Sequence, residues 1–147
     1  MILVGPSGVG KKILIDAVLK NFGSLFERKK TVTSRPKRQI EKAEHNYIFV
    51  SQEEFKKMQA ANAFIESREK GGVWHGTAHK ELERIKSQGK IPIIEVDYEG
   101  AIEINNQALE ANFCFIYPPS FEELRKRIGN RIETEHEFKL RIKEAIR

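Results

Sequence analysis

The segment GPSGVGK at residues 5–11 constrains the fold of this chain more than any other part of its sequence. It follows the apolar run MILV, which is typical of a buried strand, and apolar residues recur at helical spacing from Lys11 onward. A strand that enters a glycine turn and leaves it as a helix directs backbone N–H groups and a positive helix dipole toward one point. The pattern therefore predicts a phosphate-binding loop, with Lys11 reaching the β- and γ-phosphates of a nucleotide. A glycine turn without a ligand is the alternative, against which the flanking strand and helix argue.

The position after Lys11 departs from this pattern. A Ser or Thr there would place a hydroxyl on Mg²⁺, and this chain has Lys12 instead. An ammonium group cannot ligate a metal ion and repels one. Either Lys12 points away from the nucleotide and Mg²⁺ relies on carboxylates and water, or the handling of ATP is impaired.

The remaining pattern is typical of an α/β fold with a parallel sheet flanked by helices. Residues 91–96 and 113–117 are apolar runs that resemble buried strands, and a helix is predicted between them at about 101–109. Another helix is predicted at 78–88 and ends before Gly89. These segments, together with residues 1–30, form the predicted core, at about 1–30 and 78–126 of a single domain.

The stretch at about 31–77 has shorter strands and more turns, which predicts a small mixed lobe inserted into the core. Strands are predicted at 47–50, 64–66 and 73–75, the last two joined by a turn at Gly71 and Gly72. Capping-box patterns that begin at Ser51, Ser120 and Thr134 each predict the start of a helix. Residues from about 127 to 147 are predicted to be helical.

Composition limits the class of protein. The 147 residues suit one domain, and no apolar run approaches the length of a membrane span. The single cysteine, Cys114, excludes an internal disulfide framework and favours a reducing, cytoplasmic compartment. The 26 Lys and Arg against 21 Asp and Glu give a net charge of +5, which suits phosphorylated ligands. The basic residues are not interleaved with aromatic ones, so we expect no nucleic acid, and we expect a monomer without membrane contact.

Seven short motifs lie in order along the whole chain. Each is weak alone, because loop arginines and strand-end glutamates are mostly solvated. Their order and spacing make coincidence improbable. The motifs are GPSGVGK at 5–11, SRPKR at 34–38, YIFVS at 47–51, FIE at 64–66, GT at 76–77, EVDYEGA at 95–101 and IYPPSFEEL at 116–124. Taken together, they resemble the guanylate kinase family.

The resemblance implies phosphoryl transfer from ATP to GMP with Mg²⁺, and a GMP site in the inserted lobe. Arginines and a tyrosine would hold the GMP phosphate, and Glu66 would accept hydrogen bonds from N1–H and the amino group of guanine. His75 stands where the family usually has a second tyrosine, and Glu99 stands where it has a glutamine. The implied GMP-binding residues are Arg35, Arg38, Tyr47, Glu66, His75, Thr77 and Asp97. The implied ATP-binding residues are Gly5, Pro6, Ser7, Gly8, Val9, Gly10, Lys11 and Lys12.

The resemblance also implies a helical lid whose arginines close over the phosphates. Its segment 132–135 lacks the usual Arg-Gly-Thr run, so Arg141 has an alternative interpretation as an exposed charge on a helix. No metal ligand is assigned, although Asp97 would lie near Mg²⁺. The implied catalytic residues are Lys11, Asp97, Arg127, Arg131 and Arg141.

A guanylate-kinase-like module of low or no activity, which binds GMP or a phosphorylated peptide, is the alternative function. Lys12 and the altered lid favour it, whereas the intact loop with Lys11 opposes it. The family continues past the last predicted helix into a further strand and helix. We therefore expect the C-terminal strand and helix to be missing from this chain and its ATP side to be less complete.

Overall fold

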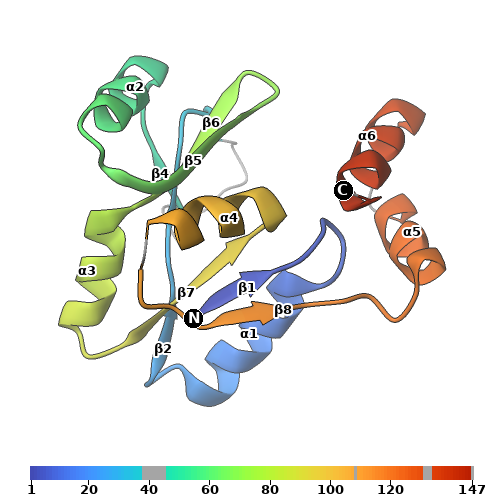
Figure 1. Ribbon diagram of the computed structural model, residues 1–147, viewed down its shortest axis with the longest axis horizontal. Coiled ribbons are helices and arrows are strands. Elements are labelled where there is room, and N and C mark those ends of the chain that lie inside the picture. The colour runs from blue at the N-terminus through green and yellow to red at the C-terminus, as the bar shows by residue number, and fades with distance from the viewer. Residues whose placement is uncertain (38–45, 108, 131–133, 147) are drawn as a thin grey trace.

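The computed structural model contains two four-stranded sheets, and it describes residues 1–37, 46–107, 109–130 and 134–146 (Figure 1). In the first, called the central sheet, neighbouring strands are parallel and follow the order β2-β7-β1-β8. Its strands are β1 (Ile2–Val4), β2 (Phe26–Arg28), β7 (Ile91–Val96) and β8 (Phe113–Phe115). This sheet confirms the prediction of an α/β fold with a parallel sheet.

The register of the central sheet aligns the ends of its inner strands. Val4 at the end of β1 pairs with Val96 on one side and with Phe115 on the other. The segments that leave β1, β7 and β8 therefore emerge at one edge. In open parallel sheets, this carboxyl edge is where ligands bind.

The second sheet has the order β4-β3-β6-β5 and comes from one continuous part of the chain. Its strands are β3 (Thr31–Thr33), β4 (Tyr47–Phe49), β5 (Phe64–Lys70) and β6 (Val73–Ala78). Gly71 and Gly72 have φ of 60° and 79°, values that suit glycine, and form the predicted hairpin turn between β5 and β6.

The first four helices pack against the two sheets, whereas the last two lie beside each other at one side of the molecule (Figure 1). They are α1 (Lys11–Phe22), α2 (Gln52–Ala60), α3 (His79–Ser87), α4 (Tyr98–Asn106), α5 (Phe121–Gly129) and α6 (Glu135–Ile146). Helix α2 begins with the predicted capping box at Ser51, and its Phe55 ring stacks on Phe64 of the second sheet at 4.5 Å between centroids. Helix α4 begins three residues earlier than predicted, because the Asp97 side chain caps it by accepting from Gly100 N. None of the helices in the described part of the chain is long and apolar enough to cross a membrane.

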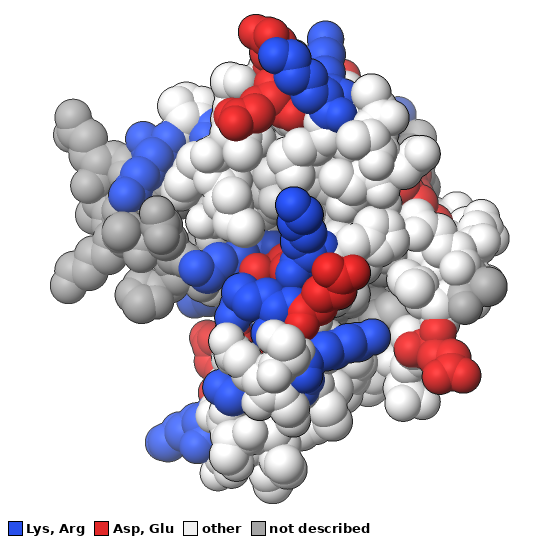
Figure 2. Space-filling view, turned by 90° about the vertical axis from the view of Figure 1, so that its left-hand side faces the viewer, with Lys and Arg blue, Asp and Glu red and all other residues white. Residues whose placement is uncertain are grey.

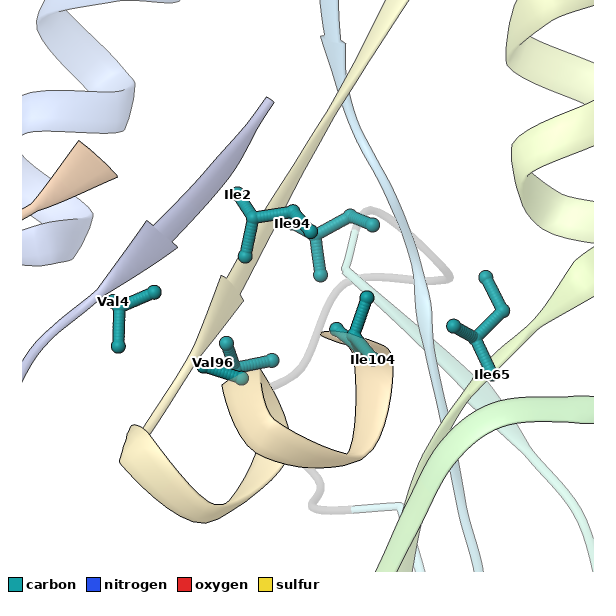
Figure 3. Close-up of a cluster of buried hydrophobic side chains, with 7 residues drawn as sticks. Ile2, Val4, Ile65, Ile94, Val96 and Ile104 are labelled. Carbon is teal, nitrogen blue, oxygen red and sulfur yellow. The ribbon is translucent and has the colours of Figure 1, made fainter. Parts of the chain in front are cut away.

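A buried apolar cluster joins the two sheets. Ile2 and Ile94 of the central sheet, Ile104 of α4 and Ile65 of β5 point into one space (Figure 3). Because Ile65 belongs to the second sheet, this cluster fixes the position of that sheet against the first. Truncating such a side chain to Ala typically costs about 2–5 kcal/mol of unfolding free energy.

Charged side chains mix on the face that bears α3, where Figure 2 shows basic and acidic groups side by side. Arg84 of α3 contacts Glu81 at 2.9 Å and Glu27 of β2 at 2.5 Å. Lys90 contacts the same Glu27 at 3.4 Å. These ion pairs attach α3 to the edge of the central sheet.

Candidate active site

A cleft of about 740 Å³ lies between the carboxyl edge of the central sheet and the second sheet. The central sheet contributes residues of the glycine loop and of the segment after β7. The second sheet contributes side chains of β3, β4, β5 and β6. Among the predicted site residues, the cleft is lined by Gly5, Pro6, Ser7, Lys11, Tyr47, Glu66, His75 and Asp97.

The glycine loop after β1 has the backbone shape of an anion site. Gly8 and Gly10 have φ of 84° and 107°, where a side chain would be strained. A Cβ on Gly5 would lie 2.7 Å from the carbonyl oxygen of Ile116, so the loop also packs closely against the segment after β8. Helix α1 has no side-chain cap and no acidic residue in its first turn. Its N-terminal N–H groups and positive dipole end are therefore suited to bind an anion.

Lys11 lies in the cleft beside this loop. Its Nζ donates to the carbonyl oxygens of Gly5 at 2.5 Å and Pro6 at 3.0 Å. Burial lowers the pKa of Lys11 to about 8, with Asp97 opposing the shift and Lys70 adding to it. An anion in the cleft would favour the ammonium form, since an opposite charge raises the pKa of a lysine.

Lys12 points away from the cleft. Its side chain is 70% exposed, and Nζ lies 3.8 Å from Asp16, one turn along the outer face of α1. The outward direction of the ammonium agrees with the first part of the first alternative drawn from the sequence. Residue 12 still supplies no hydroxyl, and the described residues include no group of three or more His, Cys, Asp or Glu that could hold a metal ion.

Val9 and the helix α5 support the loop from behind. Val9 is buried and packs against Leu124 and Ile128 of α5. Arg127 donates through Nη1 to the carbonyl oxygen of Val9 at 3.3 Å, and its Nε contacts Glu123 at 2.7 Å. Arg127 thus connects α5 with the phosphate loop.

Glu66 and Thr77 form a buried polar pair in the second sheet. They are cross-strand partners on β5 and β6, and the Thr77 hydroxyl donates to Glu66 Oε1 at 2.6 Å. Glu66 is 7% exposed and Thr77 is fully buried. The hydrogen bond fixes the carboxylate, which can accept from two adjacent donors on a flat ligand.

Arg35 is held beside Tyr47. Its guanidinium carbon lies 5.3 Å from the ring centroids of Tyr47 and Phe49, a distance typical of cation–π contacts. His75 pairs with Thr33 across the sheet. Burial lowers the pKa of His75, and the nearby cations Arg35, Lys29 and Lys70 lower it further. This environment favours the neutral imidazole, which can donate a single N–H to a phosphate.

Asp97 follows β7 and contacts both α4 and β5. It accepts from Gly100 N at 3.1 Å, and its carboxylate contacts the guanidinium of Arg68. Arg68 also contacts Glu99 at 3.3 Å. Arg68 is therefore a partner for the acidic side chain at position 99, which the sequence alone did not explain. A Cβ on Gly100 would press directly against the Arg68 guanidinium, so glycine leaves room for it.

The side chains of three arginines predicted for the site lie outside the part of the chain that the structure describes. Arg38 and Arg131 lie outside the described residues, and Arg141 belongs to α6 with a side chain that also lies outside them.

Arg68 and Lys29 are among the cleft-lining residues that sequence reasoning missed. Arg68 lies on β5, and Lys29 follows β2. Lys29 is 5% exposed, and its Nζ donates to the Thr31 hydroxyl at 2.7 Å. No spacing rule marks either position, because each side chain reaches the cleft only through the arrangement of the two sheets.

Comparison with known proteins gives one consistent result. The sequence model of the guanylate kinase family matches residues 1–146. The guanylate kinase of Clostridium perfringens is 36% identical over 99% of this chain and 67% of that protein. The guanylate kinase of Polaromonas sp. is 38% identical over 98% of this chain and 70% of that protein. The crystal structure of guanylate kinase from Anaplasma phagocytophilum has a TM-score of 0.65 and 29% identity, over 99% of this chain and 66% of that one. The chain thus spans about two thirds of the length of these relatives.

Proposed function

Because the chain belongs to the guanylate kinase family, we propose that it transfers the γ-phosphoryl group of ATP to GMP, giving ADP and GDP. The observation that supports this most directly is the shared cleft. One wall is a phosphate loop with Lys11, and the other holds the Glu66–Thr77 pair. A nucleotide donor and a nucleotide acceptor would meet between them.

The acceptor GMP would bind to the second sheet. Glu66 would accept hydrogen bonds from guanine N1–H and the exocyclic amine, with Thr77 holding the carboxylate. Arg35, Arg38, Tyr47 and the neutral His75 would bind the phosphate. Adenine offers an acceptor at N1, so it would leave Glu66 without a partner, a mismatch that polar sites reject strongly.

The donor ATP would bind at the phosphate loop. The residues of the loop from Gly5 to Gly10 other than Pro6 would offer backbone N–H groups, and Lys11 would contact the β- and γ-phosphates. We expect a divalent metal ion to arrive as part of the ATP substrate complex, since the loop lacks a hydroxyl at residue 12.

Transfer would need no side-chain nucleophile, because the acceptor phosphate oxygen is already anionic. That oxygen would bond to the γ-phosphorus while the bond from phosphorus to the β–γ bridging oxygen breaks, and ADP would leave. Lys11, Arg127, Arg131 and Arg141 would stabilise the charge on the transferring group.

We also propose that the chain consists of three functional regions. Residues 1–30 and 78–126 would form the core, 31–77 the GMP-binding lobe, and 127–147 the lid. Closure of the lobe and lid would exclude water, which competes with GMP as acceptor.

A coupled assay for ADP tests the proposal. Protein incubated with GMP, ATP and Mg²⁺ should form ADP and GDP, and Lys11→Met should abolish turnover while GMP binding by calorimetry persists. GMP binding without turnover in the wild type would instead identify a non-catalytic guanylate-kinase-like module. Absence of both would overturn the assignment of the cleft.

A further inference from the structure

Lys29 is a buried cation that the proposed function does not use. It lies between β2 and β3, is 5% exposed and lines the cleft. Lysine is almost never this buried without a partner, because the ammonium loses its hydration. One of its three N–H groups donates to the Thr31 hydroxyl at 2.7 Å. Glu66 and Glu81 lie near enough to oppose the loss of its charge.

The strand register places Lys29 at one end of a row of polar groups. β3 and β6 are antiparallel, with Val32 opposite Gly76, so the same register brings Thr31 beside Thr77. Thr77 in turn donates to Glu66 on β5. Across three strands, the row therefore begins with an ammonium at Lys29 and ends with a carboxylate at Glu66.

This order of donor and acceptor groups complements the hydrogen-bonding edge of guanine. Guanine presents the acceptor O6 and then the donors N1–H and the 2-amino group. Adenine presents a 6-amino donor where guanine has O6. A row that donates hydrogen bonds at one end and accepts them at the other complements the edge of guanine. Against adenine, the same row would place a donor opposite the 6-amino donor.

We propose that Lys29 is a specificity-determining residue that donates to the 6-oxo oxygen of the acceptor purine, next to the donors taken by Glu66. This inference rests on the proposed function and extends it to a residue outside the predicted site. Thr31 holds the ammonium in place and adds its own hydroxyl to the same end of the row. An adenine 6-amino group at this position would meet N–H donors and leave a buried charge unsatisfied.

A change of one ligand atom tests the contact. In 6-thio-GMP, sulfur replaces O6 and accepts hydrogen bonds weakly, whereas N1–H and the 2-amino group remain. Calorimetry should show that the wild type binds GMP about tenfold or more tightly than 6-thio-GMP, as expected for a hydrogen bond from a charged donor. In Lys29→Met the preference should fall to about twofold or less, with KM for ATP unchanged.

Two further variants separate a role in recognition from a role in folding. Lys30→Met changes the neighbouring lysine, whose backbone N–H donates to Glu81 at 2.9 Å, and it should keep the wild-type preference. Lys29→Gln keeps an N–H donor without the charge and should show an intermediate preference, and it decides the question if Lys29→Met does not fold.

The outcomes are distinct. An equal loss of affinity for both ligands in Lys29→Met, or an unchanged preference, would overturn the role of Lys29 and leave the kinase assignment standing. A wild type that binds no GMP would overturn the proposed function and this inference with it.

Discussion

The guanidinium of Arg68 contacts the carboxylate of Asp97, so an ion pair joins the hairpin of the second sheet to the end of the central strand β7. Arg68 also reaches Glu99 at the start of α4. Both acidic side chains are 54% exposed, whereas Arg68 is 26% exposed. The two sheets are thus connected at the cleft by charges that solvent still screens.

Replacing Arg68 with Ala removes both ion pairs and should lower the free energy of unfolding by about 1 kcal/mol or less. Urea unfolding measures this, and the difference should shrink in 1 M salt. In a double-mutant cycle that combines Arg68→Ala with Glu99→Gln, the coupling free energy of the two residues should be a few tenths of a kcal/mol. A perfectly additive double variant would contradict the contact between Arg68 and Glu99.

Lys12→Ser should raise kcat by about tenfold or more, because it restores a hydroxyl that can ligate the metal of the ATP complex. Stability should change little, since Lys12 is exposed and its only described ion pair is the 3.8 Å contact with Asp16. Lys12→Ala is the matched control, because it removes the charge and adds no ligand. Equal gains in both variants would assign the effect to charge alone.

Glu66→Gln should weaken GMP binding by about 10- to 150-fold, the range that corresponds to one lost or mismatched buried hydrogen bond to a charged group. ATP binding should be unchanged, because Glu66 belongs to the second sheet. Calorimetry with each nucleotide separates the two. Equal losses for GMP and ATP would show that the variant disturbs the whole cleft instead of the base contact.

The pH dependence should reflect Lys11. Its pKa is lowered to about 8, and only the ammonium form binds phosphate well, so kcat/KM for ATP should fall as pH rises above 8. The decline should approach tenfold per pH unit. For kcat the decline should begin at higher pH, because bound phosphates raise the pKa of Lys11 in the complex. A profile for kcat/KM that stays flat from pH 7 to 9.5 would contradict this assignment.

Most of the fold could be predicted because its signals are local. The phosphate loop, the capping box at Ser51 and the hairpin turn at Gly71 and Gly72 each depend on neighbouring residues, and the structure contains all three elements. The strand β2 was not predicted. Its sequence, Phe26–Arg28, has too few residues to show a period, and it becomes a strand by pairing with β7.

Some residues of the candidate site could likewise be predicted from the sequence, and others could not. Lys11 and Glu66 could be predicted because they belong to ordered motifs. Lys29 and Arg68 could not, because their importance depends on contacts between segments far apart in sequence. Arg68 meets Asp97 only after the two sheets have packed, and Lys29 meets the cleft only through the pairing of β3 with β6.

The topology of the sheets implies an order of events during synthesis. The second sheet comes from one continuous stretch of chain. The central sheet can form only after the strands that contain Ile94 and Phe113 have been synthesised, because Ile2 pairs with both residues. Contacts between distant segments close slowly, since the chain must first lose much of its freedom. Pulse-labelling hydrogen exchange during refolding should therefore protect the amides of β5 and β6 before those of β1, and simultaneous protection would contradict this order. On a ribosome, the second sheet would be complete while the first strand of the protein is still unpaired.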